Sequence, residues 1–215
     1  MGRVEKIGQF EGLRGILCII VIIHHFSISF FVNNPYPQLL LSDGNFAVMA
    51  FLFLSGYLVN LKVLNTENNI TFKSFLNYVK RRYCRLLPTI AIVVLFSGIL
   101  FFSGNIRTTY AIERLGLSAQ SKLATNFLDT EIQSVTQVLY EAFVGAFISR
   151  PYLNPPFWTI KYELWGCAFC YVVSFVKKTT HRDLIYITLI LLCYYFGDIY
   201  LSCVMGGGIL IRYIK

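Results

Sequence analysis

Long apolar blocks, each close to the length of a membrane-spanning helix, are the feature that most constrains the fold of this chain. A helix crosses the hydrocarbon core of a bilayer with about 20 predominantly apolar residues. Five segments reach or approach that length: residues 13–32, 46–61, 89–102, 157–176 and 184–204. The chain is 56% hydrophobic and only 14% charged, which does not fit a soluble domain. The sequence predicts an all-α, polytopic integral membrane bundle with about five transmembrane helices.

Basic residues gather between the apolar blocks, and this arrangement indicates topology. The net charge is +8, and the most basic stretches are residues 62–85 and 177–182. The positive-inside rule places both in the cytoplasm, together with the N-terminus. The loop 33–45 has no Lys or Arg and is predicted to lie outside. Anchoring therefore accounts for the charge, and we predict the lipid bilayer, and no nucleic acid, as the partner.

The remaining segments complete the expected topology. Pro88 is expected to open the third span. Residues 104–156 are mixed and polar, so we place them outside, with an interfacial or re-entrant helix at 135–148 that is too short to span. The sequon at Asn69 would then be cytoplasmic and unused. The pair Cys167-x-x-Cys170 lies within an apolar segment, where packing is the expected role, and we predict no metal site.

The first apolar block carries an arginine at its entrance and two histidines further in. Ionisable side chains inside a spanning helix are costly and by default mark a functional site. Arg14 and His25 are eleven residues apart, close to three helical turns, so they share one face at a separation of about 16 Å. His24 falls nearly a quarter-turn away. The alternative is that Arg14 only anchors the helix and that the histidines are packed, hydrogen-bonded residues.

Two further groups could carry chemistry. Arg82 and Arg85 share a helical face at i,i+3, and guanidinium groups bind phosphates in bidentate fashion. Their alternative role is topogenic charge alone. After Pro155-Pro156, Trp158 is expected at the interface and Glu163 about one turn into a span. The alternative for Glu163 is a carboxylate that a nearby lysine or an interhelical donor merely satisfies.

Taken together, these residues resemble the membrane-bound acyltransferase-3 family, which O-acylates sugars and related substrates. Four motifs appear in order across nearly the whole chain: Gly12-Leu13-Arg14-Gly15 with His25, Phe53-Leu54-Ser55-Gly56-Tyr57, Arg82-x-x-Arg85 followed by Pro88, and Trp158 to Glu163. The chain departs from the family at Thr159, Ile160 and Lys161, and it supplies about half of the usual ten or so spans. We therefore interpret residues 1–215 as a partial acyltransferase-3 membrane domain.

The resemblance implies roles for individual residues. His25 would be the catalytic acid/base or an acyl relay, and Arg14 would support the site or the donor. Arg82 and Arg85 would bind acyl-coenzyme A, with acetyl-coenzyme A the expected donor. The remaining matched positions are Glu163 and Trp158, near a glycan or lipid-linked sugar acceptor, and Ser55, whose role stays open.

Two rival hypotheses remain at this stage. A non-enzymatic transporter or channel subunit could use the same charges as a polar pathway, although the spans show no inverted half-repeat. An inactive truncated remnant is the other alternative. In each case the protein is expected to be a multi-pass integral membrane protein of the cell membrane.

Overall fold

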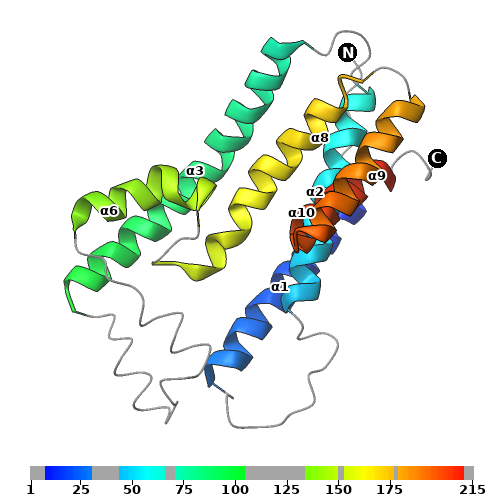
Figure 1. Ribbon diagram of the computed structural model, residues 1–215. Coiled ribbons are helices and arrows are strands. Elements are labelled where there is room, and N and C mark those ends of the chain that lie inside the picture. Colours follow the sequence, from blue (N-terminus) through cyan, green and yellow to red (C-terminus); the bar gives the residue numbers. More distant parts are fainter. Residues whose placement is uncertain are drawn as a thin grey trace. The chain divides into compact units, whose positions relative to one another are not determined.

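A computed structural model describes residues 8–30, 44–65, 71–104, 134–149, 153–176 and 179–210 (Figure 1). Within these ranges the regular structure is helical and no strand occurs, which confirms the all-α fold. Two helices are long and apolar enough to cross a membrane, over Gly44–Leu61 and Phe72–Phe102. Shorter apolar helices cover Gly12–His25, Val135–Ile148 and Ile199–Leu210. Most of the predicted loop 33–45, the sequon at Asn69 and most of 104–133 lie outside the described residues.

The described residues fall into two compact units. The first comprises residues 1–25, 35–81 and 162–215, and the second comprises 26–34 and 82–161.

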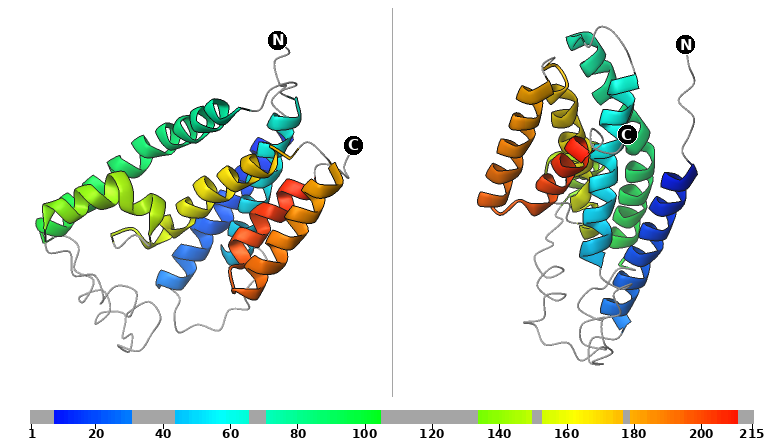
Figure 2. Two further views of the ribbon diagram at one scale, coloured as in Figure 1. Left: turned by 45° about the horizontal axis from the view of Figure 1, so that its top comes forward. Right: turned by 90° about the vertical axis from the view of Figure 1, so that its right-hand side faces the viewer.

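The first unit is built around α2 (Gly44–Asn65). On one side α1 (Gly8–Phe30) packs against it, with Leu17 and Ile20 of α1 buried against Ala47 and Leu54 of α2. Figure 2 shows α2 between α1 on one side and the α9–α10 pair on the other. The apolar side chains of α2 therefore find protein partners on both of its sides.

The other side of α2 meets α10 (Ile199–Leu210) at backbone contact. A Cβ added at Gly56 of α2 would collide with the carbonyl oxygen of Val204, and one added at Gly207 of α10 would collide with that of Phe53. Small residues permit such close approach, which is a main source of helix association in membranes. The run Gly206-Gly207-Gly208 is thus a helix-packing surface.

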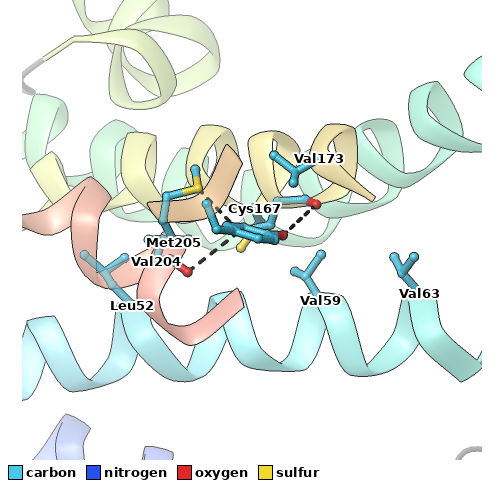
Figure 3. Packing of buried hydrophobic residues seen from close by; sticks show 9 residues of the cluster. Leu52, Val59, Val63, Cys167, Val173, Val204 and Met205 are labelled. Atoms are coloured by element: carbon cyan, nitrogen blue, oxygen red, sulfur yellow. Dashed lines mark hydrogen bonds between the residues drawn. The ribbon is translucent and has the colours of Figure 1, made fainter. Parts of the chain in front are cut away.

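The core of the first unit also includes α8 (Cys167–Val173) and α9 (Thr179–Tyr195). Figure 3 shows their buried side chains meeting those of α2 and α10. The buried members of this cluster are Leu52, Val59, Val63, Cys167, Cys170, Val173, Tyr186, Val204 and Met205. Cys167 and Cys170 are both buried in this cluster and are not joined in a disulfide, so their predicted packing role is confirmed.

A buried polar network ties these four helices together at Asn60. The Asn60 amide donates to the Tyr186 hydroxyl at 2.7 Å and to the Gly208 carbonyl oxygen at 2.5 Å. Tyr186 in turn donates to the Cys170 carbonyl oxygen at 3.1 Å. The Ser174 hydroxyl lies 3.0 Å from the Asn60 Oδ1 and 2.9 Å from the Cys170 carbonyl, and its single hydrogen can go to either. Polar side chains that are satisfied across helices in this way help hold membrane bundles together.

The second unit pairs the later part of α3 with the helical run 135–148. That run consists of α6 (Val135–Tyr140), the π-helical turn η2 (Glu141–Gly145) and α7 (Ala146–Ile148). Tyr83 near the start of this part of α3 donates to the Phe143 carbonyl oxygen at 2.6 Å, and Gly98 near its end accommodates the Val138 side chain. The two helices are therefore antiparallel, and the run 135–148 lies along α3. The choice between an interfacial and a re-entrant helix at 135–148 stays a prediction.

Helix α3 (Phe72–Phe102) begins much earlier than the predicted span 89–102 and contains Pro88 in its interior. Thr71 and Ser74 start it by bonding each other's backbone N–H groups. The expectation that Pro88 opens the span is therefore wrong, because membrane helices tolerate an internal proline. The end of the basic stretch, including Arg82 and Arg85, is helical rather than loop.

The predicted fifth span, 184–204, is also wrong as one continuous helix. The structure divides it into α9 and α10, with Gly197 at a φ of +77° between them. Asp198 caps the start of α10 by accepting from the Leu201 N–H at 3.1 Å. Ser202 of α10 contacts the Ile190 carbonyl oxygen of α9, so the two helices fold back on each other.

The predicted fourth span, 157–176, is helical but irregular, with the 3-10 helix η3 (Pro155–Thr159) and the π-helical turn η4 (Tyr162–Gly166) preceding α8.

We predict that Gly207→Ala destabilises the protein by about 1–3 kcal/mol or more, because its Cβ would overlap the α2 backbone. The neighbouring Gly206→Ala is the matched control, since its Cβ would meet only the Phe53 ring at 3.4 Å. Thermal unfolding of the detergent-solubilised variants measures both. Equal unfolding temperatures for the two variants would contradict the close packing of α2 and α10.

Candidate functional site

An ion pair between α1 and η4 is the centre of the candidate site in the first unit. The Arg14 Nη2 lies 3.9 Å from the Glu163 Oε1, and the two side chains are only 25% and 13% exposed. The guanidinium carbon of Arg14 also stands 4.6 Å from the centroid of the Phe51 ring on α2, a cation–π geometry. The two ionisable residues predicted separately are therefore brought together, and an aromatic ring flanks the arginine.

The position of Arg14 follows from the spacing of residues along α1. Phe10, Arg14, Leu17, Val21 and His24 recur at intervals of three or four, which is the period of one helical face. Phe10 packs against Tyr57 of α2 with ring centroids 5.3 Å apart, and Leu17 is buried against α2. This face therefore turns Arg14 toward α2 and into the unit, where a carboxylate and a ring hold it.

Glu163 lies in a π-helical turn, Tyr162–Gly166. Such turns insert one extra residue into a helix and often occur at functional sites. Gly166, in the same turn, lies against Val204 of α10, where a Cβ would be crowded. The local packing thus fixes the turn that carries the carboxylate.

Ser55 on α2 has a buried hydroxyl that lacks a hydrogen-bond partner among the described residues. The residue is 3% exposed, and its Oγ is both inaccessible and unpartnered. It follows Phe51, the ring beneath Arg14, by one helical turn, so both residues lie on the same side of α2. A buried polar group without a partner costs about 1–3 kcal/mol. The Ser55 hydroxyl is therefore a candidate for contact with a ligand.

The two histidines have different surroundings. His24 is half-buried, and its ring lies against Gly44, the first residue of α2. His25 is exposed and contacts the His24 ring edge-on, with centroids 5.7 Å apart. Arg14 and His25 are eleven residues apart on the continuous helix α1, but Arg14 is part-buried on the face that meets α2, whereas His25 is exposed. The structure therefore assigns a packing contact to His24 and leaves the His25 imidazole accessible.

The remaining predicted residues lie in the second unit. Arg82 is half-buried and Arg85 is exposed on α3, one turn apart, so the predicted shared face is present. Trp158 is half-buried in η3. His25 belongs to the first unit, and a pathway from it to Arg82 and Arg85 stays a prediction.

Sequence reasoning missed three residues, of which one lies in the first unit and two lie in the second. Phe51 flanks Arg14, which the hydropathy pattern of α2 does not reveal. Glu141 is only 4% exposed and accepts the Leu153 N–H at 2.9 Å. Its signal was an acidic residue inside an apolar run. Asn154 stands just before the Pro-Pro pair and bonds to Ser97 of α3.

The site's chemistry is that of acids, bases and hydrogen bonds. Within the described ranges, no group of three or more His, Cys, Asp or Glu side chains could hold a metal ion. The residues that the structure supplies are a guanidinium paired with a carboxylate, an accessible imidazole and an unpartnered hydroxyl. An imidazole can serve as a general base, and a fixed cation can stabilise developing negative charge.

Comparison with known proteins identifies a family over nearly the whole chain. A family model described as an acyltransferase domain matches residues 7–211. No curated protein and no solved structure matches the chain.

We predict a measurable coupling between Arg14 and Glu163. Replacing Arg14 by Leu leaves the Glu163 carboxylate part-buried without its partner, which should destabilise the protein by about 1–3 kcal/mol. The double variant Arg14→Leu with Glu163→Gln should recover part of this loss, because no unpaired charge remains. Thermal or denaturant unfolding of the two single variants and the double variant gives the coupling energy. Additive single effects would show that the two groups do not interact.

Proposed function

Because the chain belongs to the acyltransferase-3 family, we propose that it is a membrane O-acyltransferase acting on a glycan or a lipid-linked sugar. The family match and the apolar helices show a membrane acyltransferase in general terms. The proposal adds acyl-coenzyme A, with acetyl as the expected acyl group, as the donor. It adds a sugar hydroxyl as the acceptor.

The observation that carries the proposal is the part-buried Arg14–Glu163 pair, whose arginine lies over Phe51, one helical turn from the unpartnered hydroxyl of Ser55 on α2. A polar group that lacks a protein partner inside an apolar bundle is suited to binding an oxygen of a substrate. A part-buried ion pair can hold a fixed charge near reacting atoms without reorganisation. We propose that Ser55 contacts the substrate and that Arg14 and Glu163 support the catalytic centre.

Arg82 and Arg85 are proposed to bind the donor. They present two guanidinium groups on one face of α3, and on the predicted topology they lie at the cytoplasmic surface, where acyl-coenzyme A is available. A coenzyme A molecule carries phosphates that such a pair can bind. Trp158, in η3, is proposed to contact the sugar, since an aromatic face packs well on a sugar ring.

The proposed reaction uses His25 as the general base. The imidazole takes the proton of the acceptor hydroxyl while its oxygen attacks the thioester carbonyl carbon. A C–O bond forms, the C–S bond breaks, and coenzyme A leaves as the thiolate. The thiolate takes a proton from the imidazolium, so His25 returns to its neutral form.

We predict that His25→Ala lowers acyl transfer by about 10²–10⁴-fold, the usual contribution of a general base. The neighbouring His24→Ala is the matched control. Its loss removes a packing contact with Gly44, so it should lower stability modestly and leave activity per folded molecule within a few-fold. The assay is transfer from labelled acetyl-coenzyme A in membranes, normalised to folded protein.

If His24→Ala and not His25→Ala abolished transfer, the assignment of the base would be reversed. If the unaltered protein transferred no acyl group but carried anions across vesicle membranes, the transporter hypothesis would replace the enzyme hypothesis.

We predict that Arg85→Ala raises the KM for acetyl-coenzyme A about tenfold, because one charge-assisted phosphate contact is worth about 1.5–3 kcal/mol before screening at an exposed position. Lys80→Ala, an exposed cation on another face of α3, is the control. Saturation kinetics at two ionic strengths measure the effect. An equal change for both variants would indicate topogenic charge alone.

A further inference from the structure

The second unit contains a buried side-chain amide, that of Asn154, whose nitrogen takes no part in the hydrogen bonds of the fold. The Oδ1 of Asn154 accepts a hydrogen bond from the Ser97 hydroxyl of α3 at 3.2 Å. Its Nδ2 is inaccessible to solvent and has no hydrogen-bond partner among the described residues. An amide nitrogen carries two hydrogens, so two donors are left unmet at this position.

Helix capping does not explain Asn154. It stands immediately before the 3-10 helix η3, where an asparagine side chain commonly accepts from the first backbone N–H groups. Pro155 and Pro156 have no N–H to offer. The next backbone N–H, that of Phe157, donates to the Asn154 carbonyl oxygen at 2.9 Å. The side chain makes no cap bond and is directed to Ser97 instead.

Leu153, the residue before Asn154, is also held by a hydrogen bond to a buried side chain. The Leu153 N–H donates to the Glu141 Oε1 at 2.9 Å, and Glu141 is only 4% exposed within the π-helical turn η2. A hydrogen bond from a backbone N–H to a buried carboxylate is charge-assisted and therefore strong. The Asn154 side chain is thus bonded to Ser97 of α3, and the residue before it is bonded to Glu141 of η2.

The site lies along the apolar part of α3. Ser97 falls within the predicted third span, and Val94 and Gly98 beside it are buried. Polar groups at membrane depth are costly and mark substrate sites by default. Water is scarce there, so an unmet donor is matched by a ligand oxygen rather than by bulk solvent.

We propose that Asn154 is a substrate-binding residue whose amide N–H groups donate to an uncharged oxygen of a substrate, with Ser97 and Glu141 as its positioning residues. The oxygen is either the thioester carbonyl of the donor or a hydroxyl of the sugar. This inference rests on the proposed acyl transfer, and it adds a residue to which no role has been given.

The test uses the full chain in membranes, labelled acetyl-coenzyme A as donor and the envelope glycan fraction of the expressing cells as acceptor. Asn154→Leu keeps the volume and removes the amide, whereas Asn154→Asp keeps the Oδ1 bond to Ser97 and removes both donors. We expect each to lower kcat/KM per folded molecule at least about tenfold, the loss of one to two hydrogen bonds. Ser97→Ala should have a smaller effect, and Ser149→Ala, whose hydroxyl bonds the carbonyl of its own helix, should have none.

The kinetic constants distinguish the two sources of the oxygen. A rise in KM for acetyl-coenzyme A, or a fall in kcat alone, identifies the carbonyl. A rise in the half-saturating glycan concentration identifies the hydroxyl. Activity within twofold of the unaltered protein for both Asn154 variants overturns the inference and leaves the proposed function intact.

Thermal unfolding gives a readout that does not depend on activity. If the Asn154 amide nitrogen is reserved for a substrate, the double variant Asn154→Leu with Ser97→Ala should keep or raise the unfolding temperature, because the unmet amide is removed and no Ser97 hydroxyl is left without its acceptor. A structural role predicts a fall of several degrees, and that result overturns the inference. If the unaltered protein shows no transfer, the proposed function fails, and the unfolding temperatures still decide the status of the Asn154 amide.

Discussion

The close approach of α2 and α10 is the interaction on which the first unit depends. In an apolar solvent, burying apolar side chains offers little net gain, so helices associate through tight packing and satisfied polar groups. Gly56 and Gly207 bring the two backbones into contact, and Asn60 then reaches the Gly208 carbonyl and Tyr186. A larger side chain at either glycine would separate the helices and break the Asn60 bonds as well. Packing and polar satisfaction are therefore coupled at this one interface.

The ion pair depends on this scaffold. Glu163 is placed by a π-helical turn whose Gly166 packs on Val204 of α10, and Arg14 is placed by the face of α1 that covers α2. Both partners reach each other only if α2 and α10 hold their spacing. The stability of the unit and the geometry of the candidate site thus have a common origin in α2.

The sequence predicts the parts of the fold that follow from periodicity and hydropathy. The helical spacing of Arg14 and His25, and that of Arg82 and Arg85, needs only a continuous helix, which α1 and α3 provide. Helical spacing does not show that Arg14 meets Glu163, because that contact joins residues far apart in the chain. Hydropathy also missed the break between α9 and α10, since apolar residues flank it on both sides. The local signal was the Gly197-Asp198 pair, in which a glycine ends one helix and an aspartate caps the next. Hydropathy averaged over a long window does not register such a pair.

Glutamates in the two π-helical turns show why the functional residues of this chain are hard to read from its sequence. Glu163 is matched by a cation, and Glu141 by a backbone N–H of the segment that precedes Asn154. Each carboxylate is satisfied inside the protein, so neither is itself the group left to meet a substrate. Among the described residues, three buried polar atoms lack a hydrogen-bond partner: the Ser55 hydroxyl oxygen, the Asn154 amide nitrogen and the Nε of Arg182. A neutral hydrogen-bonding group can wait unpaired in an apolar bundle at modest cost, whereas an unpaired charge cannot. In the two π-helical turns the carboxylates are therefore paired within the protein, and two of the groups left unmet, those of Ser55 and Asn154, belong to neutral side chains that hydropathy scarcely registers.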